Sequence, residues 1–178
     1  ILPSAPPRNR TPWVVPHGVL FRGGAEGKIR TGMLKDDIVE AVLGLGPNLF
    51  YGAGIPAAII IFNKNKPAER KGKVLIVNGA EEKVPGKNQN TLSEENVERF
   101  VQAFAVFEDE ERFCRVVDME EIEKADYNLN LARYVSLEEE EEPIDVAVEL
   151  NTLKDLKAQR DTAESKMMEL VEGLGYGD

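Results

Sequence analysis

Cysteine and histidine are nearly absent from this 178-residue chain, which contains only Cys114 and His17. A single cysteine cannot form an internal disulfide, and one Cys with one His cannot build a Cys/His metal cluster. We therefore predict no metal ligands. A catalytic Cys–His pair is formally possible, but a small buried apolar residue is the simpler interpretation of Cys114, which lies between Phe113 and Val116.

Long hydrophobic runs are also missing. No stretch approaches the roughly 20 apolar residues that cross a bilayer, and residues 1–10 lack the charged-then-apolar organisation of a signal peptide. These absences predict a cytoplasmic protein without a membrane partner. With 42% apolar residues, the chain can build one core with an appended element.

Negative charge is unevenly distributed. The net charge is −10, but the first 100 residues hold 14 Lys and Arg against 10 Asp and Glu, and the remainder hold 8 against 22. An acidic half of this kind solvates a surface or docks a partner, whereas DNA contact needs cations. We therefore predict no autonomous DNA binding by this chain.

The first third of the chain alternates extended and helical patterns. Residues 1–12 hold four prolines and predict an extended segment. Residues 13–15 predict a short buried strand that Pro16 ends, followed by a turn at His17. Residues 28–35 predict a brief helix, with the apolar side chains on one face being Ile29, Met33 and Leu34.

Three apolar runs predict strands at residues 38–45, 57–62 and 73–78, and the short loops between them favour pairing in chain order at one edge of a sheet. Ser93 and Asn96 form a partial capping box before a predicted helix at 94–107. A short strand at 115–117 and a helical turn at 119–124 follow.

The last part of the chain changes character. Five consecutive glutamates, 138–142, predict an acidic linker over residues 137–143. Residues 144–178 then carry apolar side chains at helical spacing, which predicts an amphipathic helical tail interrupted by Arg160.

Four segments, in this order and spacing, resemble one family, the methylation subunits of type I restriction-modification systems, which methylate adenine N6 in DNA. The segments are VVPHGVLFR at 14–22, IR at 29–30, NLFYGAGIPAAIIIFNK at 48–64 and DYNLNLARYV at 126–135. The resemblance implies an α/β fold: the C-terminal portion of a Rossmann-like, S-adenosylmethionine-dependent methyltransferase sheet, over residues 13–136, with a C-terminal helical extension. It also implies that residues 126–135 are structural, with tyrosine and arginine side chains tying the chain back onto the domain.

Two motifs of the family are missing from these 178 residues. The chain has no glycine-rich turn after a first strand and no Asn-Pro-Pro-Phe loop; the segment Gly44-Leu45-Gly46 follows a late strand and is a poor candidate for a cofactor loop. Since methyl transfer depends on positioning the cofactor against the amino group, we expect no activity, no catalytic residue and no cofactor site in this chain alone. The intact family enzyme uses S-adenosylmethionine.

Candidate DNA contacts follow from the resemblance. A methylase flips its target base out of the duplex, and an aromatic ring can stack on that base. Phe50 and Tyr51 occupy the matching loop, although packing in the core explains them equally well. Arg22, Lys28 and Arg30 are candidates for DNA-backbone contact, with ordinary solvated charge as the alternative. For His17, a local structural role is favoured over catalysis.

The resemblance also implies partners: the specificity subunit and the restriction subunit, with DNA reached through the complex. The tail helix either docks the specificity subunit or packs on its own domain. One alternative function is a non-catalytic subunit-interaction module of a truncated methylase relative. Another is an unrelated small α/β protein, which would lack a strand pair around Phe50 and Ile59.

Overall fold

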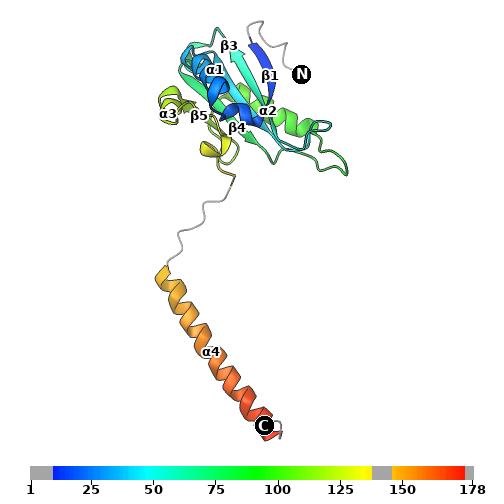
Figure 1. Ribbon diagram of the computed structural model, residues 1–178, viewed down its shortest axis with the longest axis vertical. Helices are drawn as coiled ribbons and strands as arrows, with labels where there is room; N and C mark the ends of the chain where they lie inside the picture. The colour runs from blue at the N-terminus through cyan, green and yellow to red at the C-terminus, as the bar shows by residue number, and fades with distance from the viewer. Residues whose placement is uncertain (1–9, 138–145, 175–178) are drawn as a thin grey trace. The chain divides into compact units, whose positions relative to one another are not determined.

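The computed structural model describes residues 10–137 and 146–174, which belong to two units divided after Glu138 (Figure 1). The first unit contains a five-stranded sheet with helices, and the second contains one long helix, α4 (Val146–Gly173). In these described ranges, no helix is both long and apolar enough to cross a membrane. Most of the predicted acidic linker lies outside the described residues.

The sheet is mixed, with the strand order β1 (Arg10–Pro16), β3 (Ala57–Asn63), β2 (Val39–Leu45), β4 (Lys73–Gly79) and β5 (Cys114–Asp118). β2 and β4 are parallel, and the other neighbouring pairs are antiparallel. It follows that β1, β2 and β4 run in the same direction and end at the same edge of the sheet.

Alternating side chains divide the core into two layers, as strand geometry requires. Val42 and Ile76 face the layer that contains α1 (Gly24–Lys35), α3 (Met119–Lys124) and the segment after α3. Leu43 and Val77 face the other layer, formed with α2 (Glu94–Val106). The sheet therefore lies between helices on both faces, which confirms the predicted α/β class. Short 3-10 turns complete the unit: η1 (His17–Leu20), η2 (Ala68–Arg70) and η3 (Leu131–Arg133).

One glycine in β2 admits a side chain from the first layer. A Cβ on Gly44 would lie 2.0 Å from Leu131 Cδ1 and 3.2 Å from the Val77 carbonyl oxygen. Leu131, in η3, is only 4% exposed. The absence of a side chain at position 44 thus lets the segment after α3 lie directly on the sheet.

A charged cluster is buried on β2. Glu40 is fully buried and accepts hydrogen bonds from Arg10 (Nε at 2.6 Å and Nη2 at 2.8 Å), from Asn63 (3.0 Å) and from Arg70 (3.1 Å). Arg70 also lies over the rings of Phe104 and Phe107, with its Cζ 5.1 and 4.2 Å from the two centroids. The cluster connects β1, β2, β3 and η2, so one carboxylate joins segments far apart in the sequence.

The structure corrects several predictions. β1 begins at Arg10, and its Trp13 and Val14 are more than half exposed because β1 is an edge strand, not a buried one. β3 and β4 are not neighbours, since β2 lies between them, and the three strands form the middle of the sheet. α1 begins four residues early, at Gly24, and Ile29 is exposed while Arg30 points inward.

Other predictions are confirmed. β2, β3, β4, β5 and α3 match their predicted segments closely, and Cys114 is buried. Ser93 and Asn96 form a full capping box: Ser93 Oγ accepts from the Asn96 amide, and Asn96 Oδ1 accepts from the Ser93 amide. The predicted tail is helical from Val146 to Gly173, and its apolar side chains Leu150, Leu153, Leu156 and Met167 are 47–56% exposed.

Candidate nucleic-acid interface

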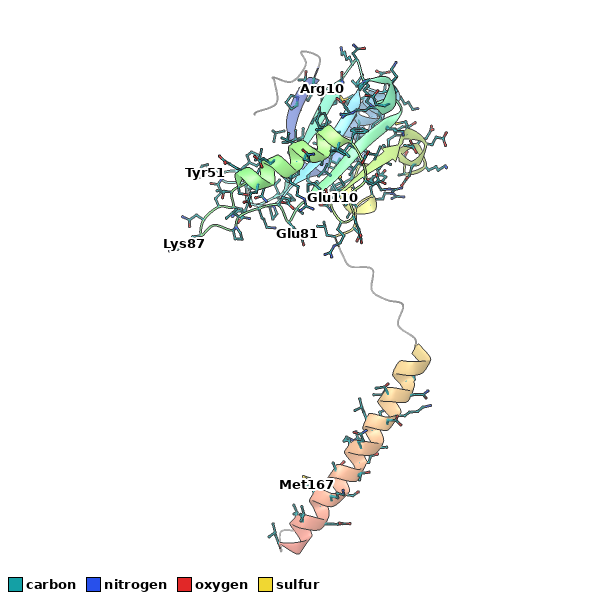
Figure 2. The ribbon with its side chains drawn as sticks, turned by 180° about the vertical axis from the view of Figure 1, so that it is seen from behind. Arg10, Tyr51, Glu81, Lys87, Glu110 and Met167 are labelled. Carbon is teal, nitrogen blue, oxygen red and sulfur yellow. The ribbon has the colours of Figure 1, made fainter. Side chains whose placement is uncertain are left out.

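Three segments leave the sheet at the edge where β1, β2 and β4 end. They are η1 after β1, the loop 46–56 after β2 and the loop 80–92 after β4. In doubly wound sheets, ligands bind beyond the carboxyl ends of parallel strands. Figure 2 shows Tyr51, Glu81 and Lys87 toward this end and Arg10 at the other. This edge is therefore the candidate site.

The two predicted stacking residues lie in a tight turn on the first loop. The Ala53 amide donates to the Phe50 carbonyl (3.1 Å), and Gly52 has φ +71°, which the third position of a type II turn requires. Phe50 is 41% exposed and Tyr51 is 94% exposed. The alternative that these rings pack in the core therefore does not describe Tyr51, whose ring is free to contact a ligand.

The loop after β4 is hydrogen-bonded to the loop that carries this turn. Asn90 donates from its backbone N–H to the Asn48 carbonyl (2.8 Å) and from its side-chain Nδ2 to the Pro47 carbonyl (2.9 Å). Gln89 Nε2 donates to the Leu49 carbonyl (2.7 Å). Neither residue was singled out from the sequence, because the carbonyls that they bind lie 40 or more residues earlier in the chain.

His17 lies beside the same turn. Its backbone amide donates to the Pro56 carbonyl (3.2 Å), and its ring packs edge-on against Phe21, with centroids 5.9 Å apart. Among the described residues, its buried Nε2 atom has no hydrogen-bond partner. Burial lowers the pKa of His17 below its ordinary value, so the ring is neutral near pH 7.

The three predicted cations separate into two groups. Arg22 and Lys28 are exposed, and Lys28 lines a cavity of about 480 Å³ with Gly24 and Gly27 at the start of α1. Arg30 is 9% exposed, and its guanidinium donates to the carbonyls of Val19 (2.7 Å), Arg22 (3.0 Å) and Tyr127 (2.8 Å). Its hydrogen-bonding capacity is thus largely used within the fold, which leaves Arg22 and Lys28 as the accessible cations.

The segment 126–135 has the structural role that was predicted for it. Leu129 donates to the Leu20 carbonyl (2.9 Å), Tyr134 donates to the Asn128 carbonyl (2.6 Å), and Asn78 Nδ2 donates to the Val135 carbonyl (3.0 Å). Arg133 is exposed, and the buried arginine that binds this segment is Arg30, which donates to the Tyr127 carbonyl.

Gly44 and Gly46, at the end of β2 and directly after it, do not fit a cofactor cradle. Space beside Gly44 is filled by Leu131, and a Cβ on Gly46 would lie 2.9 Å from the Ala80 carbonyl oxygen. A cofactor loop needs glycines whose open side faces the ligand. Both open sides here face the chain itself, so Gly44-Leu45-Gly46 does not fit S-adenosylmethionine.

Comparison with known proteins agrees with this geometry. A model of the N-6 DNA methylase family matches residues 1–143. Two methylase subunits of type I restriction enzymes from Methanocaldococcus jannaschii, MjaVIII and MjaVII, are 44% and 41% identical over 90% and 94% of the chain. The chain spans only 29% and 30% of their lengths.

A solved structure gives the same relationship. The methyltransferase subunit of a type I restriction-modification system from Streptococcus thermophilus is 38% identical and matches with a TM-score of 0.67, covering 71% of this chain and 26% of its own. The paired strands β2 and β3 around Phe50 and Ile59 further argue against an unrelated α/β protein. The chain belongs to the N-6 DNA methylase family.

Proposed function

We propose that this chain is the C-terminal part of a type I restriction-modification methylase subunit and supplies the base-contacting edge of an enzyme that methylates adenine N6 in DNA. The observation that carries the proposal is the exposed Phe50–Tyr51 turn at the carboxyl end of the parallel strands, in a chain of this family. The remaining part of the subunit would hold S-adenosylmethionine and the catalytic loop. The chain alone would be inactive.

The exposed edge of the sheet supports this role. Trp13 is 53% exposed and Val14 is 59% exposed on β1, beside an apolar groove of about 470 Å³ that Trp13, Met33 and Phe62 line. Exposed apolar surface on an edge strand is a liability that proteins usually cover. We propose that residues 13–136 complete a methylase domain whose other part covers this surface.

The tail helix suits a partner. Leu150, Leu153 and Leu156 recur at helical spacing along α4, and we propose that they pack against the specificity subunit, with the restriction subunit joining the same complex in the cytoplasm. A subunit-interaction module without catalysis is the second candidate function. The length of α4, Val146–Gly173, suits such docking, and the test below distinguishes the two.

The proposal is tested by exchanging segments. This chain replaces the matching segment of the MjaVIII methylase subunit, and adenine methylation is measured with labelled S-adenosylmethionine and the specificity subunit of that system. We expect methylation by the chimera and, by calorimetry, no micromolar binding of S-adenosylmethionine to the 178-residue chain alone. A folded chimera that assembles but never methylates DNA would favour the interaction module.

Removing the exposed rings is expected to slow methylation. In the chimera, Phe50→Ala with Tyr51→Ala should lower the methylation rate about tenfold, because stacking on an extruded base is worth roughly 1–3 kcal/mol. Tyr51→Phe, which keeps a ring, is the matched control and should retain the parent rate. Equal rates for the parent and the double variant would contradict a stacking role.

The exposed cations should act through charge alone. Arg22→Gln and Lys28→Gln should each weaken DNA binding by the chimera and reduce the slope of log affinity against log salt by about one per phosphate contact. Thermal stability should not change. Arg30→Gln serves as the contrast, because losing buried hydrogen bonds should lower the melting temperature. Unchanged salt slopes for both exposed residues would remove them from the interface.

A further inference from the structure

Three consecutive carbonyl groups before the aromatic turn are all bound by one other loop. The carbonyls of Pro47, Asn48 and Leu49 accept, in order, from Asn90 Nδ2, the Asn90 amide and Gln89 Nε2, at 2.9, 2.8 and 2.7 Å. Backbone carbonyls in a surface loop ordinarily bind water. Binding of all three by two adjacent residues fixes the backbone immediately before Phe50.

The loop that donates these bonds is itself closed. Val84 and Thr91 exchange two backbone hydrogen bonds, of 2.7 and 3.0 Å, so residues 84–91 form a small hairpin. A Cβ on Gly86 would lie 2.0 Å from the Gln89 carbonyl oxygen, so the tight approach inside the hairpin depends on that glycine. We name residues 84–91 the brace. Because β2 and β4 are hydrogen-bonded neighbours, the brace starts from the same edge as the turn it contacts.

The aromatic turn needs support of this kind. Tyr51 is 94% exposed, so its ring makes little contact that could hold it in place. Its position is therefore set by the backbone of the loop and by the Phe50–Ala53 hydrogen bond. A loop that is ordered before binding avoids the entropy cost of ordering it on the ligand.

We propose that the brace positions the Phe50–Ala53 turn for insertion beside an extruded base, with Gln89 and Asn90 as positioning residues that do not themselves contact the base. This proposal rests on the proposed function and adds to it a second loop that controls base extrusion. It predicts that losing either side-chain donor affects extrusion more than DNA affinity.

The first test measures the loop in the 178-residue chain without DNA. Gln89→Glu and Asn90→Asp keep the shape of each side chain and replace an N–H donor by a carboxylate oxygen facing a carbonyl. By hydrogen exchange, protection of the Ala53 and Asn90 backbone amides, which donate to the Phe50 and Asn48 carbonyls, should fall about tenfold, the loss of roughly one hydrogen bond, while β2 and β3 keep theirs. Asn88→Asp, at an exposed neighbouring position, makes the same charge change and should have no effect. Unchanged exchange in both variants would overturn the brace.

The second test measures extrusion in the intact methylase that contains this chain. Duplex DNA carries 2-aminopurine at the target adenine, and its fluorescence rises when the base leaves the stack. We expect the extruded population to fall about tenfold in Gln89→Glu and Asn90→Asp, an effect of roughly one lost hydrogen bond, with a smaller change in DNA affinity. Parent-level fluorescence in variants with a loosened loop would overturn the positioning role.

Failure of the proposed function has a different signature. The variant with both Phe50→Ala and Tyr51→Ala would then extrude the base as well as the parent does, whatever the brace variants show. In that case the exchange difference would establish the brace as a loop contact, and its role in extrusion would be overturned.

Discussion

Replacing Glu40 with alanine is expected to lower the free energy of unfolding by about 3–5 kcal/mol, the usual cost of breaking a buried ion pair from one side. Arg10 and Arg70 would face each other without the carboxylate, and Asn63 would lose its acceptor. The lower end is expected, because the two arginine side chains are 18% and 12% exposed and can regain some hydration. Urea unfolding of the two proteins at pH 7 measures the difference.

The pH dependence of the stability that Glu40 contributes provides a control for this prediction. Burial raises the pKa of Glu40, but hydrogen bonds from Arg10 and Asn63 and the charges of Arg10 and Arg70 outweigh it, so the pKa lies below its ordinary value. Glu40 therefore contributes its stability above the unfolded pKa of about 4.3 and loses it as the pH falls through the lower folded pKa. The free energy of unfolding of Glu40→Gln should therefore lie below that of the parent at pH 7, and the difference should become smaller below about pH 4. A difference that stays constant from pH 7 to pH 3 would contradict this account.

Truncating Leu131 to alanine is expected to cost about 2–5 kcal/mol, as for other fully packed leucines. Its side chain fills the space beside Gly44, so the loss leaves a cavity between the sheet and the segment 126–135. Chemical denaturation of the chain measures the cost.

The partner glycine provides a test of the contact itself. Gly44→Ala alone should destabilise by about 1–3 kcal/mol, because the added methyl meets Leu131. In the Leu131→Ala background it should cost less, since the methyl enters the vacated space. Strictly additive effects in this double-mutant cycle would show that the two residues do not interact.

Individual strands of the sheet are encoded locally in the sequence, whereas their order in the sheet is not. β2 and β4 were predictable because unbroken apolar runs identify strands buried on both faces. Their order in the sheet was not, because loop length favours neighbours in the chain, whereas β2 pairs in parallel with β4 and separates it from β3. The edge position of Trp13 was not predictable for the same reason, because an apolar run of three residues does not distinguish an edge strand from a buried strand.

The candidate site divides in the same way. Phe50 and Tyr51 were found through the resemblance, and their exposure fits a contact role. Arg30 could not be distinguished from Lys28 in the sequence, because its carbonyl acceptors come from segments as distant as Tyr127. Gln89 and Asn90 lie 40 residues or more from the carbonyls that they bind, and no local pattern carries such a pairing.

The position of β3 between β1 and β2 has a consequence for synthesis on the ribosome. β1 pairs with β3, and residues 17–56 separate the two strands in the chain, so β1 finds no partner in this chain until β3 has emerged. At translation rates of about 5–20 residues per second, that interval lasts several seconds. During this interval the apolar side chains of Trp13 and Val14 belong to a strand that has not yet paired, and they are available for non-native contacts.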